Sequence, residues 1–399
     1  MKKNIPLFKV KMNPTAKTAV SKVLDSGFIG QGSKVDEFEK LLIPRFNNPY
    51  TVTVNSATSA EHLALHLLKT PRDSQLVFDG VASYTSHWPG IQDGDEVLAT
   101  PLTCTATNFP ILANNMKIKW VDVDKKTLNM DLDDLARKIT SKTKVIFVVH
   151  WGGYPIDLDK LKEIQNKAHK QFGFKPAIIE DCAHAFGSKF NGKPLGSHGN
   201  ICTFSFQAIK HMTTADGGAL ILPHEELNRR ARLLRWYGID RDSERTDFRC
   251  EADIPEWGFK FHMNDVNAAI GIENLKIVDE EVIQKHKDNA AYYDKHLRVI
   301  GNYDKICLNT DRNPKMESAF WIYSILVNRK DDFMRYMKEC GITVSQVHER
   351  NDIHSCVKDF KTQLPSLDWV RDRLVNIPVG WWVTEEDREY IVKCIKKGW

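Results

Sequence analysis

The spacing of apolar residues along the chain alternates between a helical period and a strand-like period. Residues 13–27 carry apolar residues at helical spacing up to a terminal glycine, and a second helical run follows the turn-rich loop at 28–32. Residues 51–69 are typical of a strand, a turn of small residues and a helix with one apolar stripe. Such a turn presents helix N-terminal amides to an anion, although Ser56 or Thr58 acting only as an N-cap explains the same residues.

An alternation of strand-like and helical runs fills the region that follows. The runs are EVLAT, CTATNFPILANN, IKWVDVD, LDDLARKI, KVIFVVH, LDKLKEIQNKAHK, AIIEDCA and ICTFSF. The strands are near-continuous runs of valine, isoleucine and phenylalanine, as a sheet buried on both faces requires. The pattern therefore predicts an α/β domain of layered helices and strands. Residues 70–93 break the rhythm with proline, glycine, serine and aromatic residues, and we expect a surface excursion with a small apolar anchor there.

The pattern changes again near residue 276. A long helical run leads into the strand-like FWIYSILV, a helical DDFMRYMKEC and a terminal helical TEEDREYIVKCIKK. A chain of 399 residues also exceeds the size at which a single core stops growing. We expect two domains, a large one at 1–275 and a smaller α+β one at 276–399.

Composition and charge narrow the classes of function. The net charge is +4 with both signs mixed along the chain, which gives no electrostatic reason to expect a nucleic-acid partner. The N-terminal residues MKKNIPLFKVKM contain no apolar signal core, and no run approaches the roughly 18 apolar residues of a membrane span. The eight cysteines are scattered without a CxxC pair, which favours reduced thiols and suggests no metal site. We expect a cytoplasmic protein without membrane contact.

Lys210 is the first candidate for chemistry. It follows the strand-like ICTFSF, and a polar turn, HMTTADGG, separates it from a second strand-like run, ALIL. A lysine between two buried strands loses its charge because desolvation disfavours the ammonium, and the free amine is a nucleophile. We therefore hypothesise that Lys210 forms a Schiff base with a carbonyl cofactor. The alternative is a lysine that only closes the turn.

Asp181, the turn at 55–59 and Ser205 are further features that fit such a cofactor. Asp181 ends the buried run AIIED, and a strand-end carboxylate faces the ligand edge of an α/β sheet. If the cofactor is pyridoxal 5'-phosphate (PLP), this carboxylate keeps the pyridine nitrogen protonated. The turn can bind the phosphate, with Ser205 as a second hydroxyl donor on the strand face opposite Phe204 and Phe206. The alternatives are an N-cap or an ordinary ion pair for Asp181 and a backbone-bonded hydroxyl for Ser205.

Six motifs in a fixed order carry a resemblance to a known family. They are NSATSAEHLAL, TPLTCTATN, IEDCAHAFGS, FSFQAIKHMTTADGGAL, LLRWYGIDRD and GFKFHMNDVNAAIGIENLK. Together they resemble the DegT/DnrJ/EryC1/StrS family of PLP-dependent sugar aminotransferases, from IPLF at residue 5 to the terminal helix. The resemblance implies a fold type I enzyme, with a large domain around a mostly parallel, seven-stranded sheet and a smaller C-terminal α+β domain.

The resemblance also implies a reaction and its partners. Members of this family move an amino group from L-glutamate to a nucleotide-linked keto-sugar by a ping-pong mechanism, as homodimers with shared active sites. Pyridoxamine 5'-phosphate is the cofactor form between the two half-reactions. By position in the motifs, Lys210 matches the Schiff-base lysine, Asp181 the residue at the pyridine nitrogen, and His184 the residue near the cofactor's 3-hydroxyl. The matches to the phosphate cup are Ala57, Thr58 and Ser205.

Two positions depart from the family pattern. Cys104 stands where the family usually stacks an aromatic ring on the pyridine, and a thiol offers no π face. Lys260 stands where an asparagine usually reaches the phosphate of the partner subunit's cofactor. A lysine there can still bind phosphate, as a point charge rather than as an amide. Both departures concern how the cofactor is held.

The position of the lysine separates two reactions within the family. One branch carries histidine in place of the lysine and dehydrates sugars, and here His211 directly follows Lys210. Counting from residues 205–206 and from residues 217–218 puts Lys210 on the lysine position, so we expect transamination, with Lys210 carrying a proton between the amino acid's α-carbon and the cofactor's C4′. The alternatives are a PLP-dependent nucleotide-sugar dehydratase and a non-catalytic PLP-binding regulatory protein. The intact Asp181–Lys210 pair argues against the second.

Candidate contacts to the substrate come from three places. Phe28 and Ile29 resemble positions that line the sugar pocket, and His348 in SQVHERND is another candidate, unless it only caps a loop. A basic run can receive the pyrophosphate of a sugar nucleotide, although helical spacing favours solvent-facing side chains for several members. The run consists of Arg229, Arg230, Arg232, Arg235 and Arg241.

Overall fold

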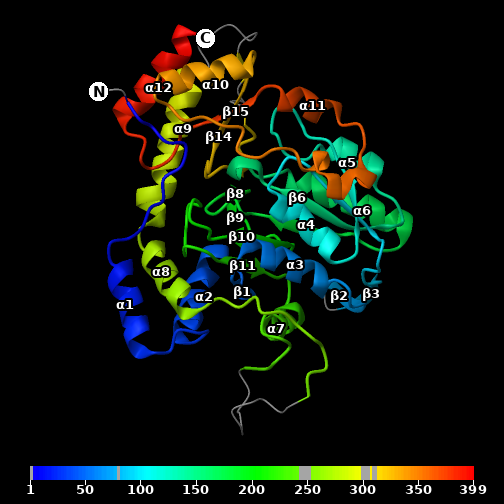
Figure 1. Ribbon diagram of the computed structural model, residues 1–399. Helices are drawn as coiled ribbons and strands as arrows, with labels where there is room; N and C mark the ends of the chain where they lie inside the picture. The colour runs from blue at the N-terminus through cyan, green and yellow to red at the C-terminus, as the bar shows by residue number, and fades with distance from the viewer. Residues whose placement is uncertain (1–2, 79–80, 242–252, 298–305, 308–311) are drawn as a thin grey trace.

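The computed structural model describes residues 3–78, 81–241, 253–297, 306–307 and 312–399, with no account of the side chains in 72–87 and 306–307 (Figure 1). Its centre is a seven-stranded sheet in the order β1-β11-β10-β7-β6-β4-β5. Neighbouring strands are parallel except at β11, which runs antiparallel to β1 and to β10. The strands are β1 (Thr51–Val54), β4 (Glu96–Ala99), β5 (Lys117–Trp120), β6 (Thr143–Val149), β7 (Ala177–Asp181), β10 (Ile201–Ser205) and β11 (Gly218–Ile221). The predicted α/β class and the mostly parallel sheet are confirmed.

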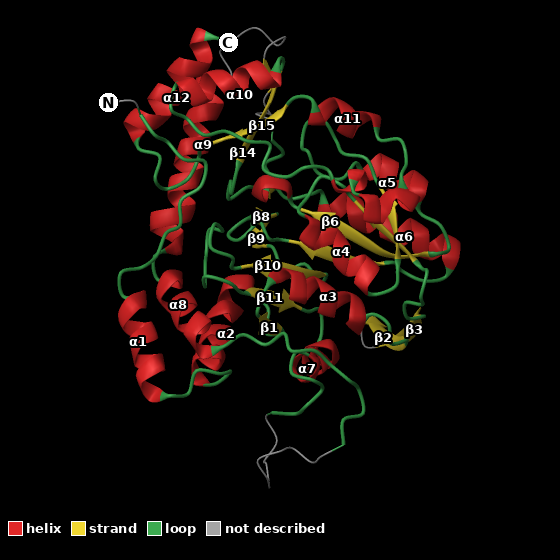
Figure 2. Ribbon diagram, in the orientation of Figure 1, coloured by secondary structure: helices red, strands yellow, loops and turns green. Residues whose placement is uncertain are grey.

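Helices cover both faces of this sheet, because its strands are apolar on both sides (Figure 2). One face packs against α2 (Ser33–Phe46), α5 (Leu132–Lys138), α6 (Leu158–Phe172) and α8 (Asp265–Leu275). The other face packs against α3 (Ala57–Leu67), α4 (Thr105–Ala113), α7 (Glu225–Leu234) and α11 (Pro365–Arg371). The first helix, α1 (Ala16–Ser26), lies against α8 and ends at Gly27, whose φ of 73° is the left-handed conformation of a helix C-cap.

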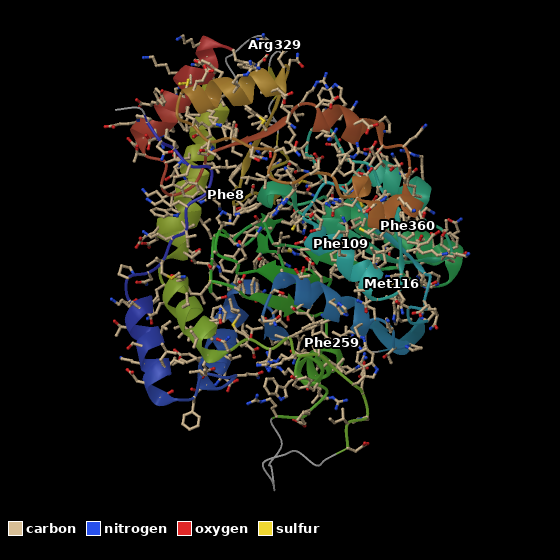
Figure 3. The ribbon with its side chains drawn as sticks, viewed as in Figure 1. Phe8, Phe109, Met116, Phe259, Arg329 and Phe360 are labelled. Atoms are coloured by element: carbon tan, nitrogen blue, oxygen red, sulfur yellow. The ribbon has the colours of Figure 1, made fainter. Side chains whose placement is uncertain are left out.

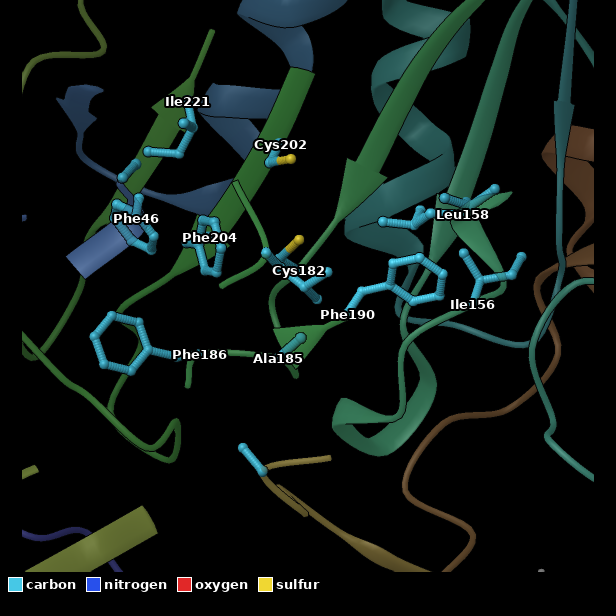
Figure 4. Packing of buried hydrophobic residues seen from close by; sticks show 14 of the residues in the cluster. Phe46, Ile156, Leu158, Cys182, Ala185, Phe186, Phe190, Cys202, Phe204 and Ile221 are labelled. Carbon is cyan, nitrogen blue, oxygen red and sulfur yellow. The ribbon is translucent and has the colours of Figure 1, made fainter. Parts of the chain in front are cut away.

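Side-chain alternation along β10 sets which residues face which layer. Phe204 packs against Phe46 of α2 with ring centroids 4.3 Å apart (Figure 4). The ring centroids of Phe206 and Phe38 are 5.6 Å apart. Ser205 therefore points to the opposite face, toward α3, as the sequence predicts.

A smaller α+β unit is formed by the C-terminal part of the chain. Its core lies between a three-stranded sheet and three helices. The sheet contains β12 (Ile306–Cys307), β14 (Tyr323–Val327) and β15 (Leu374–Ile377). The helices are α9 (Gln284–Leu297), α10 (Lys330–Glu339) and α12 (Glu385–Lys397). A π-helical turn, η2 (Val278–Ile283), directly precedes α9. Ile5 joins this core and pairs with Ile342, so the N-terminal segment lies on the C-terminal unit. The domain limits at residues 275 and 276 remain a prediction.

The segment at 70–93, predicted as a surface excursion, contains a β-hairpin. β2 (Arg72–Phe78) pairs with β3 (Val81–Trp88) antiparallel, and the turn residues 79–80 lie outside the described residues. The expected apolar anchor is present, because the Trp88 indole packs on the core and donates to the Leu68 carbonyl at 2.9 Å. In the sequence, Asp79–Gly80 separates two runs of strand-forming residues, and an Asp-Gly pair in this position favours a hairpin turn. This signal predicts a hairpin even though the segment is rich in polar residues.

Short elements complete the chain. They are β8 (Lys189–Phe190), β9 (Lys193–Pro194), β13 (Met316–Glu317), η1 (Trp151–Gly153), η3 (Asn351–Ile353) and η4 (Ser355–Phe360). No helix within the described ranges is both long and apolar enough to cross a bilayer.

Candidate active site

Lys210 lies in the turn between β10 and β11, at the carboxyl edge of the parallel strands. A backbone hydrogen bond from its N–H to the Gln207 carbonyl fixes the turn, and its Nζ lies 3.6 Å from the ring centroid of Trp321. Burial lowers the pKa of the Lys210 amine to about 8, because desolvation outweighs the opposing electrostatic influence of the neighbouring acidic groups, of which Asp181 has the largest effect. This lowered pKa agrees with the prediction that a lysine between two buried strands tends to lose its charge. Near neutral pH, part of the amine is uncharged and nucleophilic.

Asp181 is the last residue of β7, the parallel neighbour of β10. Its side chain is only 4% exposed, and Thr203 is its register partner. One carboxylate oxygen accepts from Thr107 Oγ1 at 2.7 Å and the other from the Ala183 N–H at 2.8 Å. These donors hold the carboxylate in one orientation at the ligand edge of the sheet, as expected of a strand-end acid.

The N-terminus of α3 supplies an anion site beside Lys210's strand. Ser56 is the N-cap and accepts from the Ser59 N–H at 3.1 Å. In the part of the chain that the structure describes, no hydrogen bond uses the N–H of Ala57 or Thr58. The N-cap alternative and the anion-site prediction are therefore compatible, since capping by Ser56 leaves these two amides for a ligand.

Gly218 is the reason why α3 can start so close to the sheet. A Cβ at Gly218 would lie 2.6 Å from the Ala57 nitrogen, so only glycine permits this approach. Gly218 is also the register partner of Ser205, whose side chain points toward α3. The Ser205 hydroxyl, which accepts a 3.3 Å hydrogen bond from the Gln207 N–H, thus lies beside the two free amides.

Aromatic rings form the wall of the site opposite α3. His184 stacks on Trp321 with centroids 4.0 Å apart and on His348 at 5.4 Å, and Trp151 packs edge-on against both histidines. Phe8, labelled in Figure 3, belongs to the N-terminal segment and stacks on Trp321 with ring centroids 5.2 Å apart. The structure thus brings the predicted His184 and His348 together at Lys210. Sequence reasoning missed the other three rings.

Trp321 reaches Lys210 because the strand predicted from FWIYSILV begins later than expected. The chain takes a left-handed conformation at Phe320, with φ of 54°, and β14 starts only at Tyr323. The prediction of a continuous strand is wrong at its first three residues. The turn lets the Trp321 indole donate to the Ile209 carbonyl at 2.9 Å, which fixes the ring under the lysine.

Glu61, on the first turns of α3, is a second acid that sequence reasoning missed. Its side chain is 1% exposed and is hydrogen-bonded to the Asp181 carboxyl. Its Oε2 has no hydrogen-bond partner among the described residues. The available signal was its position inside the apolar stripe of AEHLALHLL, where a glutamate interrupts a buried face.

Cys104 is the N-cap residue of α4 and is exposed. It lies close enough to Lys210 and Glu61 to interact with both electrostatically, and its contact with the cofactor stays a prediction. It offers no ring. The rings beside the lysine are those of Trp321 and His184.

Phe28, Ile29 and Lys260 are not buried in the cleft of their own chain. Phe28 is 84% exposed and Ile29 is 52% exposed, in the loop between α1 and α2. Lys260 is exposed as well, and its backbone pairs with Trp236 and accepts from the Asn55 side chain at 3.3 Å. Their roles therefore stay predictions.

The arginine run is mostly structural. Arg230 pairs with Glu256 at 2.6 Å, and Arg232 and Arg235 both bind Glu39, at 2.8 and 2.5 Å. Arg230 and Arg235 are buried, so the solvent-facing alternative does not hold for these two, and the pyrophosphate role stays a prediction. Arg229 is exposed, and Arg241 donates to the Gln31 carbonyl at 3.0 Å.

One cluster has the composition of a metal site, His150 with Glu180 and Cys182. His150 Nδ1 accepts from the Ile156 N–H at 3.1 Å, so Nε2 carries the proton and donates to Glu180 at 2.9 Å. The other Glu180 oxygen accepts from Asn200 at 2.7 Å. These contacts occupy the ligand atoms of His150 and Glu180, so these two residues form a hydrogen-bonded structural pair.

The cleft fits PLP on each of its chemical groups. The free amides of α3 suit the phosphate, the Asp181 carboxylate suits a protonated pyridine nitrogen, and the partly neutral Lys210 amine suits the aldehyde. The fold and the cleft together define a PLP-dependent enzyme of fold type I.

Comparison with known proteins narrows this class. The chain belongs to the DegT/DnrJ/EryC1/StrS aminotransferase family, whose model matches residues 11–396. It is therefore a PLP-dependent sugar aminotransferase, and solved structures of similar proteins include both a PLP form and a pyridoxamine form.

Similar structures extend over the whole chain. AtS13 from Actinomadura melliaura is 50% identical with a TM-score of 0.90, covering 100% of this chain and 99% of that one. The sugar aminotransferase CalS13 from Micromonospora echinospora is 46% identical with a TM-score of 0.89, covering 99% and 100%. The UDP-4-amino-4-deoxy-L-arabinose–oxoglutarate aminotransferase of Shewanella sediminis is 29% identical over 412 aligned positions, 98% of this chain and 97% of that protein.

Proposed function

We propose that the protein transfers an amino group from L-glutamate to a nucleotide-linked keto-sugar by a ping-pong mechanism. The observation that carries this proposal is the pairing of a pKa-lowered Lys210 with a strand-end Asp181 beside the free amides of α3. The relative from Shewanella sediminis, whose name gives a UDP-sugar and oxoglutarate, supports the substrate classes. We further propose that the reaction takes place in the cytoplasm.

When bound, PLP would supply an electron sink for the step in which the α-proton leaves. Lys210 moves that proton from the α-carbon of glutamate to the C4′ atom of the cofactor and later returns it to the sugar carbon. Its lowered pKa of about 8 lets it act as base and as acid near neutral pH. Asp181, held by Thr107 and Ala183, keeps the pyridine nitrogen protonated.

The remaining cofactor and substrate contacts are assigned by position. The Ala57 and Thr58 amides and the Ser205 hydroxyl bind the phosphate. His184 lies near the 3-hydroxyl, and His348, stacked behind it, contacts substrate. Burial lowers the pKa of His348 to about 4, so this ring is neutral in the working enzyme.

The functional unit in this proposal is a homodimer with shared active sites. Lys260 then binds the phosphate of the partner's cofactor, while Phe28 and Ile29 line the partner's sugar pocket. Their exposure in a single chain supports this, since 84% of the Phe28 side chain is otherwise in water.

Hybrid dimers test the shared site. Lys210→Ala dimers should be inactive, and Lys260→Ala dimers should bind the cofactor weakly. Mixed dimers of the two variants contain one intact site, so mixing should restore about a quarter of wild-type activity. Additive activity without recovery would show that Lys260 serves its own chain or no site.

The dehydratase alternative needs a histidine on the lysine position, and His211 is placed elsewhere. Its ring packs edge-on against His286 of α9 at 4.6 Å, away from the Trp321 face that carries Lys210. Glutamate consumption separates the reactions. A transaminase forms one 2-oxoglutarate per aminated sugar, whereas a dehydratase forms product without that stoichiometry.

A substrate screen tests the proposal directly. Purified enzyme with glutamate is offered a panel of nucleotide-linked keto-sugars, and products are read by mass. A gain of one amine with loss of the keto oxygen is the expected result. Cofactor binding without turnover of any keto-sugar would favour the non-catalytic regulatory alternative.

A further inference from the structure

Glu61 is a buried acid that the proposed mechanism does not use. It lies on α3, one turn after the phosphate-binding amides, with 1% of its side chain exposed. Its carboxyl group is hydrogen-bonded to that of Asp181, and one of its oxygens, Oε2, has no partner among the described residues. A buried carboxylate oxygen without a donor is costly, whereas a protonated carboxyl carries its own donor.

The charges around Glu61 do not favour its ionised form. The groups that act on it are Asp181 from β7, Cys104 before α4, and Lys210 after β10. Only Lys210 is a cation, and no ion pair within the described residues joins it to Glu61 or Asp181. Two adjacent buried carboxyl groups cannot both ionise without a large cost, so they hold one proton between them.

Asp181 is the member of the pair that keeps the charge. It already accepts hydrogen bonds from Thr107 and from the Ala183 N–H, both of which stabilise the carboxylate. Among the described residues, none donates a hydrogen bond to Glu61 Oε2. Consistent with this division, burial and the Asp181 charge raise the pKa of Glu61 well above its ordinary value.

We propose that Glu61 is a neutral carboxylic acid that donates a hydrogen bond to Asp181 and thereby weakens the negative charge that Asp181 exerts on Lys210. The consequence is functional. A full Asp181 charge would hold the Lys210 ammonium, whereas a shared one leaves more of the neutral amine available for its role in the proposed transamination. Glu61 is thus a positioning residue that acts through Asp181, and this role rests on the proposed function.

The test reads Lys210 in apo-protein, without substrate. Competitive acetylation by acetic anhydride, with Lys210 located by mass spectrometry, gives its reactivity from about pH 6 to about pH 10 and hence the midpoint of its titration. Glu61→Gln keeps a neutral donor to Asp181 and should leave the midpoint within about 0.3 pH unit of wild type. Glu61→Leu removes the donor and should raise the midpoint by about half a unit or more.

A double variant separates this effect from simple repacking. In an Asp181→Asn background, Glu61→Leu should no longer change the midpoint of the Lys210 titration, because the carboxylate charge of Asp181 is absent. A lowered midpoint in Glu61→Gln would mean that Glu61 is ionised and would overturn the proposal. So would an unchanged midpoint in a folded Glu61→Leu. Neither result bears on whether keto-sugars are aminated, which the substrate screen decides separately.

Discussion

Two buried glutamates, on helices that cover opposite faces of the central sheet, have opposite electrostatic surroundings. Glu39 on α2 is 4% exposed and Glu61 on α3 is 1% exposed, so burial alone does not distinguish them. Yet the pKa of Glu39 is lowered to about 2, because Arg235, Arg232 and the Thr53 N–H overcome its desolvation, while the pKa of Glu61 is raised by burial beside Asp181. Identical burial therefore produces a structural anion in one place and a neutral acid in the other.

The difference lies in the hydrogen-bond donors. Glu39 accepts from Arg232, from Arg235 and from both the N–H and the hydroxyl of Thr53, at 2.5 to 2.8 Å. It ties α2 to β1 and to the end of α7. Glu61 faces the cleft, where the donors are few and another acid is adjacent. Fully satisfied charges stabilise the fold, and poorly satisfied ones mark the site that binds a ligand.

Removing the Lys210 amine should have the largest effect on activity. Lys210→Ala should reduce transamination by about 10³-fold or more, because the proton shuttle is lost, and should also release the cofactor on dialysis. Rates are measured by 2-oxoglutarate formation, and retention by the visible absorption of the bound cofactor. Lys193→Ala, an exposed lysine on β9, is the matched control and should behave as wild type. Wild-type amination by Lys210→Ala would refute the assignment.

Stability should distinguish the two glutamates at neutral pH. Glu39→Gln leaves Arg235 and Arg232 without their counter-charge and should cost about 3–5 kcal/mol in urea unfolding of the apo-protein. Glu61→Gln replaces one neutral donor with another and should change stability by less than about 1 kcal/mol or increase it. Glu37→Gln, in an exposed pair with Lys34, is the control and should cost less than about 1 kcal/mol. Equal losses for both buried glutamates would contradict the comparison.

The pH dependence of these variants should have opposite signs. The folded pKa of Glu39 is below its unfolded value of about 4.3, so its contribution is present above that pH and is lost as pH falls toward about 2. The loss of unfolding free energy caused by Glu39→Gln should therefore become smaller at acidic pH. The folded pKa of Glu61 is raised, so keeping its proton costs stability as pH rises above about 4.3. In thermal unfolding of the apo-protein, the unfolding temperature of Glu61→Gln should therefore rise relative to that of the wild type as the pH increases.

Much of this architecture follows from sequence. The apolar runs predict the layered sheet, and Asp181 and Lys210 lie at strand ends where parallel strands place ligand contacts. Trp321 and Phe8 could not be predicted to meet, because they lie 313 positions apart and their contact depends on a left-handed turn at Phe320. The sequence shows Glu61 as an acidic residue within an apolar stripe, but its contact with Asp181 could not be predicted, because the two residues meet only in the folded chain.

The smallest expected effect concerns Cys104, where a ring is absent from the cofactor side of the cleft. Cys104→Phe should slow cofactor loss by about 2- to 10-fold, since a stacked ring contributes about 0.5–1.5 kcal/mol. Dilution into buffer with a cofactor trap, followed by absorption, measures the rate, and Cys104→Ser is the size-matched control. An unchanged rate in Cys104→Phe would mean that Trp321 and His184, already stacked beside Lys210, supply the missing surface. In that case Trp321→Ala should accelerate the loss, and part of the aromatic support for the cofactor would come from the C-terminal unit.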